Sequence, residues 1–342
     1  MRKITSLFVV LLLLWNCASC GIFLSQESNR YNATYLDLFD TVTTITGYMD
    51  SENVFQSEVQ IIHDKLEEYH KLYDIYNDYS GIKNIKTIND YAGGTPIEVD
   101  SRIIDLLLFC QEAFQLTNGK VDITMGSVLS IWHEARERGI EQPESAALPT
   151  NATLAAAAEH TGFDLLEIDT DAGTVRLTDP DARLDVGAVA KGYALEQVCQ
   201  QAPEGLLVSL GGNIRATGPK PDGGSWVVGI QNPDSSDEYL NTVWTKDTSV
   251  VTSGDYQRYF IVDGIRYHHI IDPNTLYPGQ NWRAVTVLCE DSGMADVLST
   301  ALFLLPYEDG VALAKNCGAE AMWVSFDGSS IYSEGFQNHI KI

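Results

Sequence analysis

The stretch "LLVSLGGNIRATGPKPDGGSWVVGIQNP", residues 206–233, indicates the fold class of this chain. A Gly-Gly pair interrupts one β-rich run, and Pro219 to Gly224 predict a hairpin loop before the next run. Similar runs, separated by turns rich in Asp and Gly, fill most of the later sequence, with two helices among them at about 188–201 and 293–304. A long series of strands with few helices indicates an α+β fold rather than an alternating parallel α/β fold.

The first half of the chain is richer in helix. Apolar residues recur at steps of four and three from Phe55 to Tyr73, which is the period of one helical face. A β-branched run before this helix predicts a strand over 35–49, and the polar, Asn-rich segment 74–95 predicts a loop. We expect further helices from Ser101 to Thr117 and in the segment that leads to a loop at 140–152.

The N-terminus, "MRKITSLFVVLLLLWNCASCG", has the pattern of an export signal. Two positive charges precede an apolar run that is too short to span a bilayer as a stable helix, and small residues precede Cys20. We therefore expect a lipoprotein-type signal peptide at 1–19, a lipid on Cys20, a tether over 20–34 and one domain over 35–342. The mature protein would be an exported lipoprotein, anchored at the extracytoplasmic face of the cell membrane. Plain cleavage and an uncleaved anchor stay open.

Charge limits the ligands that the chain can bind. Its 342 residues carry a formal net charge of -25, whereas the hydrophobic content of 44% and the charged content of 20% are ordinary for a globular protein. Such an acidic chain is not expected to bind nucleic acid, which requires basic surface. An anionic ligand would have to be held by local cations or by a metal ion, against the overall field.

Four cysteines follow Cys20, at positions 110, 199, 289 and 317. They form no CxxC pair, which argues against a zinc site or a thioredoxin-type motif. Each lies in an apolar run, so disulfide pairing after export and simple burial as thiols both stay open.

Residues 183–198, "RLDVGAVAKGYALEQV", predict a strand, a tight turn and a helix. Small residues in the turn let a ligand approach the backbone, and the amides at a helix N-terminus favour anions. Lys191 adds a cation at the same place. The pattern is common, and a lysine at such a position is more often solvated than functional, so both interpretations stay open.

Three oxygen-bearing side chains share one face of the helix at 293–304. Asp296, Ser299 and Thr300 stand at i, i+3 and i+4 on a helix that is otherwise apolar. Buried oxygen groups cost free energy unless a partner satisfies them, and Mg²⁺ is a partner that prefers oxygen ligands. Helix capping or ordinary buried hydrogen bonds are the alternative.

Two adjacent histidines occur in "IRYHHIIDPNTLYPG", residues 265–279. The run predicts a strand that ends at the Asp-Pro turn. Successive strand side chains point to opposite faces, so His268 and His269 cannot bind one ion side by side. At most one of them faces a given pocket, and from the run alone either histidine can be structural.

These segments, in this order, resemble the FAD:protein FMN transferase (ApbE) family. The resemblance covers about Asp37 to Phe326 and is carried by six motifs: "VDITMG", "LDVGAVAKGYA", "LVSLGGNIRATGPKPDGGSWVVGIQNP", "VTSGDYQRYF", "YHHIIDPNTLYPG" and "MADVLSTALFLL". It implies an α+β fold that is related to the T-fold, with helices on a largely antiparallel sheet and FAD in a cleft between the two parts.

The resemblance also implies a chemistry. Family members, often exported lipoproteins, bind FAD and Mg²⁺ and transfer FMN to a Thr or Ser hydroxyl of an exported partner flavoprotein, releasing AMP. The family's base corresponds to His269. The metal would be held by Asp296, Thr300, Ser299 and the backbone carbonyl of Ala188. The implied flavin contacts are Phe39, Tyr76, Lys120, Val121, Asp122, Asp185, Lys191 and Ile271.

Two other functions fit the same residues. An FAD pyrophosphatase would use water in place of the protein hydroxyl and give free FMN and AMP. A non-catalytic flavin-binding lipoprotein would hold FAD without cleaving it. We expect the transferase, because Asp296, Thr300, Lys191 and His269 are all present at the positions that match the family.

Overall fold

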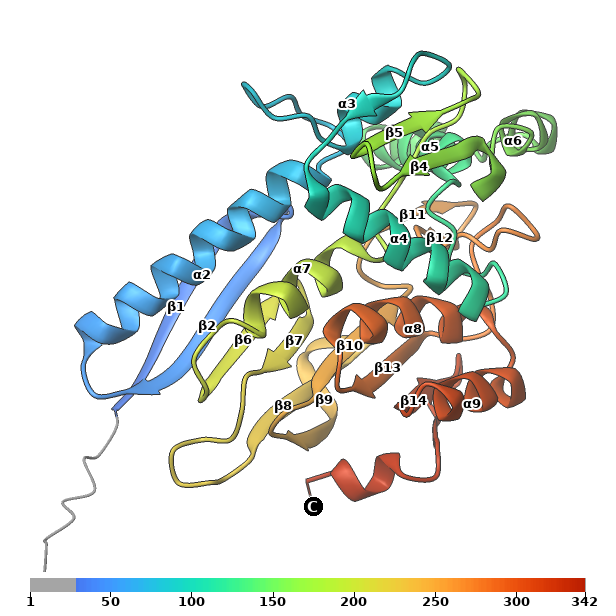
Figure 1. Ribbon diagram of the computed structural model, residues 1–342. Coiled ribbons are helices and arrows are strands. Elements are labelled where there is room, and N and C mark those ends of the chain that lie inside the picture. The colour runs from blue at the N-terminus through green and yellow to red at the C-terminus, as the bar shows by residue number, and fades with distance from the viewer. Residues whose placement is uncertain (1–28, 342) are drawn as a thin grey trace, which may run out of the picture.

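The computed structural model describes residues 29–341, and its centre is one eight-stranded sheet in which every neighbouring pair is antiparallel. Figure 1 shows this sheet running through the molecule. In spatial order its strands are β1 (Asn29–Leu38), β2 (Thr41–Met49), β6 (Leu206–Leu210), β7 (Asn213–Ala216), β10 (Ser249–Gly254), β13 (Ala284–Cys289), β14 (Glu320–Val324) and β15 (Ser330–Tyr332). The prediction of an α+β fold with a largely antiparallel sheet is confirmed.

Three small antiparallel sheets surround the large one. They consist of β3 (Ile97–Glu98), β5 (Thr174–Leu177) and β4 (Leu166–Asp169); of β8 (Trp226–Asn232) and β9 (Ser235–Thr245); and of β11 (Tyr259–Val262) and β12 (Ile265–His268).

Helices cover one face of the large sheet (Figure 1). The helices are α2 (Glu52–Tyr73), α3 (Ile85–Asp90), α4 (Ser101–Leu116), α5 (Gly126–Glu141), α6 (Asn151–Ala158), α7 (Ala190–Cys199), α8 (Ser292–Leu304) and α9 (Tyr307–Asn316). Of these, α2, α7, α8 and α9 pack on the strands of the large sheet. Within the residues described, no helix is long and apolar enough to cross a membrane.

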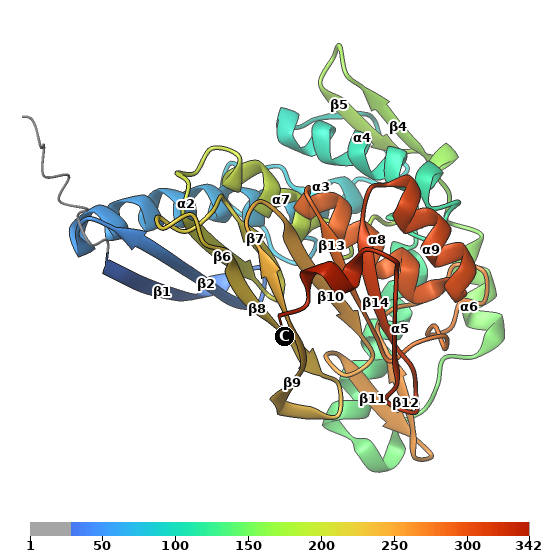
Figure 2. The same ribbon diagram turned by 90° about the horizontal axis from the view of Figure 1, so that it is seen from below.

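Successive side chains of the central strands point to opposite faces of the large sheet, so a hydrophobic core forms on each face. Val285 and Val287 of β13 pack with α8, whereas Ala284 and Leu288 point to the opposite face and pack with the β8–β9 hairpin. Figure 2 shows that hairpin beside β7 and β10. All six residues of β13 are buried, as expected for a strand covered on both faces.

The structure corrects several predicted boundaries. The segment 35–49 is not one strand, because β1 and β2 form a hairpin around Phe39 and Asp40, which both have φ of 51°. Two residues of positive φ make a type I′ turn. Residues 29–34, expected in the tether, belong to β1, while the signal peptide and Cys20 lie outside the described residues.

Two expected loops also differ. The segment 74–95 contains the short helix α3, whose start is capped by Asn84. The turn at Pro219–Gly224 joins β7 of the large sheet to β8 of a separate hairpin, so the prediction of a hairpin loop there is wrong.

The four cysteines from Cys110 onward are free thiols, and burial raises the pKa of each.

Candidate active site

A cavity of about 730 Å³ opens at the end of the large sheet where the β1–β2 turn and the N-terminus of α7 meet the loops around β10 to β12. That volume is typical of a pocket for a small molecule or cofactor. Ten of the residues that the sequence predicts for FAD or metal binding line it, together with the predicted base: Phe39, Tyr76, Lys120, Val121, Asp122, Asp185, Ala188, Lys191, Ile271, Asp296 and His269. Thr300 also lines it, and Ser299 does not.

The N-terminus of α7 is fixed against Asp296 of α8. The backbone amide of Gly192 donates to Asp296 Oδ2 at 2.9 Å, and Lys191 Nζ lies 3.9 Å from the same oxygen. A Cβ at Gly192 would stand 2.4 Å from both the Asp296 Cβ and the Ser292 carbonyl oxygen, so only glycine permits this approach. Burial raises the pKa of Asp296, which Lys191 opposes.

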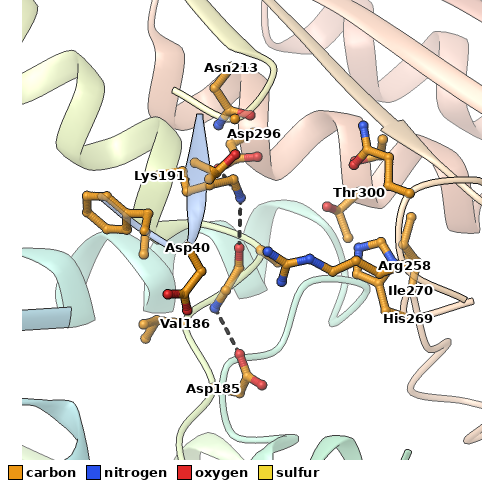
Figure 3. A pocket seen from close by; sticks show the side chains of 18 of the residues that line it. Asp40, Asp185, Val186, Lys191, Asn213, Arg258, His269, Ile270, Asp296 and Thr300 are labelled. Atoms are coloured by element: carbon orange, nitrogen blue, oxygen red, sulfur yellow. Dashed lines mark hydrogen bonds and ion pairs between the residues drawn. The ribbon is translucent and has the colours of Figure 1, made fainter. Parts of the chain in front are cut away.

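The other predicted metal ligands are arranged around this carboxylate. Thr300 lines the cavity one helical turn after Asp296, and Figure 3 shows Asp296 near Lys191 and Asn213, with Thr300 toward Arg258. Ser299 is fully buried behind them. Its hydroxyl is hydrogen-bonded to Ser253 Oγ at 2.8 Å and to the Asp296 carbonyl at 2.9 Å. The structure therefore brings Asp296, Thr300 and Ala188 together at the cavity and leaves Ser299 in a supporting position.

The two histidines have different surroundings. His268 Nε2 is hydrogen-bonded to the Gly279 carbonyl at 2.8 Å, and its Nδ1 accepts from the Ile270 amide at 3.2 Å, so His268 holds the turn together. His269 faces the cavity, and its buried Nδ1 has no hydrogen-bond partner in the described part of the chain. Burial, followed by repulsion from the Arg258 guanidinium, lowers the pKa of His269 to about 3.

Two arginines face the same space without a carboxylate partner. Arg136 and Arg258 both line the cavity, and neither guanidinium lies within 4.0 Å of a carboxylate among the side chains that the structure describes. Burial and the charge of Arg258 lower the pKa of Arg136. Arg258 points toward the middle of the site in Figure 3, from the side that carries His269. Two facing cations in so acidic a protein constitute an anion site.

Aromatic and acidic groups form the remaining wall. The Tyr76 ring lies against His133 with centroids 5.5 Å apart. The backbone amide of Phe39 donates to His70 Nδ1 at 3.2 Å, which holds the β1–β2 turn at the cavity. Asp122 accepts from the Thr124 hydroxyl at 2.6 Å, and burial raises its pKa.

Asp185 and Lys120 are also tied into the wall. Asp185 Oδ1 accepts from the Gly187 amide at 2.9 Å, and the Gly187 carbonyl accepts from Lys191 Nζ at 3.2 Å, as the dashed lines in Figure 3 mark. Lys120 Nζ lies 2.9 Å from Asp272 Oδ1, so its charge is largely compensated. The Asp-Pro turn after the histidines is thereby joined to the segment before α5.

Sequence reasoning missed Arg136, His133 and Asn213. Arg136 and His133 lie one turn apart on α5, where charged residues resemble an ordinary solvated helix face; their i, i+3 spacing on the side of Trp132 was the available signal. Asn213 directly follows the Gly-Gly turn, and its buried side-chain nitrogen lacks a hydrogen-bond partner among the residues described.

An antiparallel α+β fold with a deep cavity that combines cations, buried oxygen donors and a histidine is suited to a small anionic ligand. The chain belongs to the ApbE family, whose model matches residues 39–323. It is 32% identical to the FAD:protein FMN transferase of Treponema pallidum, over 75% of this chain and 75% of the relative. Identity to the Haemophilus influenzae protein of the same name is 28%, over 92% and 91%.

Solved structures agree. The ApbE protein of Thermotoga maritima superimposes with a TM-score of 0.81 at 30% identity, covering 92% of this chain and 100% of that one. The flavin transferase ApbE of Vibrio cholerae gives a TM-score of 0.74 at 26% identity, covering 91% and 99%. The predicted family and fold are confirmed.

Proposed function

We propose that the chain is an FAD:protein FMN transferase that uses Mg²⁺ and modifies a Thr or Ser hydroxyl of an exported flavoprotein. The observation that carries the proposal is the cavity that is lined by two arginines (Arg136 and Arg258), by the oxygen donors Asp296 and Thr300, and by His269. The names of the relatives support the same activity.

The reaction is a phosphoryl transfer. The acceptor hydroxyl oxygen forms a bond to the FMN-side phosphorus of FAD, the bond from that phosphorus to the bridging oxygen breaks, and AMP leaves with that oxygen. Most of the catalysis in such a step comes from positioning and charge stabilisation. Arg136, Arg258 and Lys191 would hold the diphosphate, and Tyr76 would lie against a ring of the ligand.

His269 would take the proton of the attacking hydroxyl. Its pKa is depressed in the ligand-free protein by burial and by surrounding cations. The diphosphate of FAD places negative charge beside those cations, which opposes their repulsion and raises the basicity of His269 when substrate is bound.

The donors around Asp296 suit a hard cation. Asp296 is buried and borders the cavity, which a hydroxyl (Thr300) and a loop residue (Ala188) also line. Mg²⁺ is typically held by one or two carboxylates together with substrate phosphates. When bound, Mg²⁺ would neutralise charge on the phosphate oxygens. Asp296, Thr300 and the Ala188 carbonyl would hold it, with Ser299 fixing the backbone behind Asp296.

The assay for this proposal is covalent labelling. We expect an exported flavoprotein to become fluorescent in a denaturing gel after incubation with the protein, FAD and Mg²⁺, and to stay dark with EDTA. Free FMN and AMP formed equally fast without any acceptor would instead identify a pyrophosphatase. Intact FAD after hours with metal and acceptor would identify a binding protein.

Asp296→Asn tests the metal site, because the amide keeps the shape of the side chain and removes its charge. We expect the Mg²⁺ concentration for half-maximal transfer to rise by at least about tenfold, with FAD binding in the absence of metal little changed. An unchanged metal requirement would contradict the assignment of Asp296.

We also propose that the protein acts outside the cytoplasm, anchored by a lipid on Cys20. The signal-like N-terminus supports this location. Metabolic labelling with a fatty acid, compared between the native chain and Cys20→Ala, tests it: labelling of both chains alike would refute the anchor.

A further inference from the structure

A second cavity adjoins the first and leads into it. Its volume is about 320 Å³, and Gly212, Gln231, Thr252 and Gln257 line both cavities. The shared wall means that a molecule lying in the second cavity reaches the space next to Asp296 and His269 without crossing the protein interior.

The second cavity follows the free edge of β8. Val228, whose side chain packs toward the large sheet, and the next residue, Gly229, both line it, which is possible where a cavity runs along a strand edge. Within residues 29–341, β8 pairs with β9 alone. Ile214 of β7 and Val250 of β10 form the opposite wall.

The backbone of Gly229 points to this free edge. On the far side of the hairpin, the amide of Lys341 donates to the Thr242 carbonyl at 2.7 Å, so the Thr242 backbone is directed away from β8. Thr242 is the register partner of Gly229. Gly229 and Thr242 therefore form a non-hydrogen-bonded pair. In an antiparallel ladder, both residues of such a pair direct their N–H and C=O groups away from the partner strand. The N–H and C=O of Gly229 therefore face the cavity rather than β9.

We propose that an extended segment of the acceptor protein binds in this cavity as an added strand on β8 and presents its Thr or Ser hydroxyl to the main cavity. The inference rests on the proposed function, since transfer to a protein requires FAD and a polypeptide in one site. Main-chain hydrogen bonds to a free strand edge are an established mode of peptide recognition. They bind a segment through its backbone and leave its side chains free for the reaction.

The lining favours a polypeptide over a second anionic ligand. None of the ten residues that line the second cavity is charged, in contrast to the cations of the main one. From Thr252 the wall continues to Ser253, whose hydroxyl is 2.8 Å from Ser299, the neighbour of Thr300. An added strand thus ends beside the proposed metal ligands.

The test compares Gly229→Pro with Gly229→Ala. Both variants add a Cβ, which stands 2.5 Å from the Tyr239 ring, and that ring is 69% exposed and free to move. Only proline removes the N–H, and because this N–H points away from β9 the hairpin keeps its hydrogen bonds. The probe is the flavoprotein that the native chain labels in the assay above. We expect the KM for that protein to be about tenfold higher for Gly229→Pro than for Gly229→Ala, with equal affinity for FAD.

Each outcome decides the question. An equal KM for the two variants, or a parallel loss of FAD affinity in Gly229→Pro, overturns the inference. A native chain that binds FAD and labels no protein refutes the proposed function and the inference with it.

If Gly229→Pro does not fold, hydrogen exchange of the native chain gives the answer. The amides of residues 226–232 should exchange more slowly when both FAD and the acceptor protein are added than with FAD alone. Unchanged exchange there would refute strand addition.

Discussion

His269 is held in an unusual state for a proposed base. Its Nδ1 is buried without a partner in the described chain, and its pKa is lowered by burial and by the nearby Arg258. The folded ligand-free protein therefore favours the neutral ring. Because the pKa is lower in the folded state than in the unfolded state, the neutral ring stabilises the fold. This contribution to stability is complete above the unfolded pKa near 6.5 and is lost as the pH falls from there toward about 3.

We expect the His269 ring to remain neutral down to about pH 4 in the absence of FAD. Nitrogen NMR of labelled histidine measures this directly, with the resonance assigned by its loss in His269→Gln. A midpoint near 6.5 would show that the ring is solvated and that the cations around it have little influence.

Removal of the base should slow transfer without removing the ligand. His269→Gln is expected to lower kcat by about 10² to 10⁴, the usual contribution of general base catalysis. The dissociation constant of FAD, measured by quenching of flavin fluorescence, should change less than threefold. Loss of FAD binding together with activity would instead identify His269 as a structural residue.

Some residues that line the cavity conflict with their local sequence pattern and could be predicted from it, whereas others do not. Asp185 and Lys191 stand beside small residues, and Asp296 with Thr300 stands on an apolar helix, so each conflicts with its local pattern. Arg136 conflicts with nothing in its own helix. Only the fold, which brings α5 against the loop of Arg258, shows that the two charges share a site.

The contact between α7 and α8 is the element-level basis of the site. The Gly192 amide binds Asp296, and the Ser292 amide donates to Glu196 Oε2 at 2.8 Å. Glu196 is in turn paired with Arg215 of β7 at 3.1 Å. These polar links, surrounded by apolar packing, fix the register of one helix against the other.

Gly192→Ala should disturb this contact. The added methyl group overlaps the Asp296 Cβ and the Ser292 carbonyl, so we expect about 1–3 kcal/mol less stability toward urea. The Mg²⁺ requirement should rise as well, because Asp296 has to move. Gln197→Ala, on a half-buried position of the same helix, serves as the control and should stay within about 0.5 kcal/mol of the native chain. A fully stable Gly192→Ala with native metal dependence would contradict the packing described here.

At the element level, sequence periodicity located most helices and strands but not which strands pair. The turn at Phe39–Asp40 lacks the Asn-Gly or Asp-Gly pair that usually marks a type I′ turn, so the two strands appeared as one. The separation of β8 from β7 depends on packing of Val228 and Ile230 against the far face of the large sheet, a long-range contact that local patterns do not contain.

At the scale of the whole molecule, the net charge of -25 opposes an anionic substrate, whereas the cavity attracts it. The repulsion by the net charge acts over a longer distance than the attraction by the cations of the cavity. The Debye length falls from about 30 Å at 0.01 M salt to about 8 Å at 0.15 M, so added salt screens the distant carboxylates more than the cations that touch the ligand.

The association rate of FAD should therefore rise with salt, by a few-fold between 0.01 and 0.15 M NaCl. Stopped-flow quenching of flavin fluorescence measures this rate. Arg258→Met should lower the affinity at every salt concentration and leave the upward trend intact. A rate that falls steadily with salt would show that the local cations dominate at long range.

The β1–β2 hairpin also sets the distance between the cavity and the first residue of β1. Its turn reaches the cavity at Phe39, while the other end of β1, at Asn29, is the end nearer to Cys20 in the sequence. Ten strand residues at about 3.4 Å each span about 34 Å. With a lipid on Cys20, the length of the hairpin would help to set the distance between the cavity and the bilayer. The proteins that it can modify would be those whose acceptor hydroxyl lies at a matching distance from the membrane.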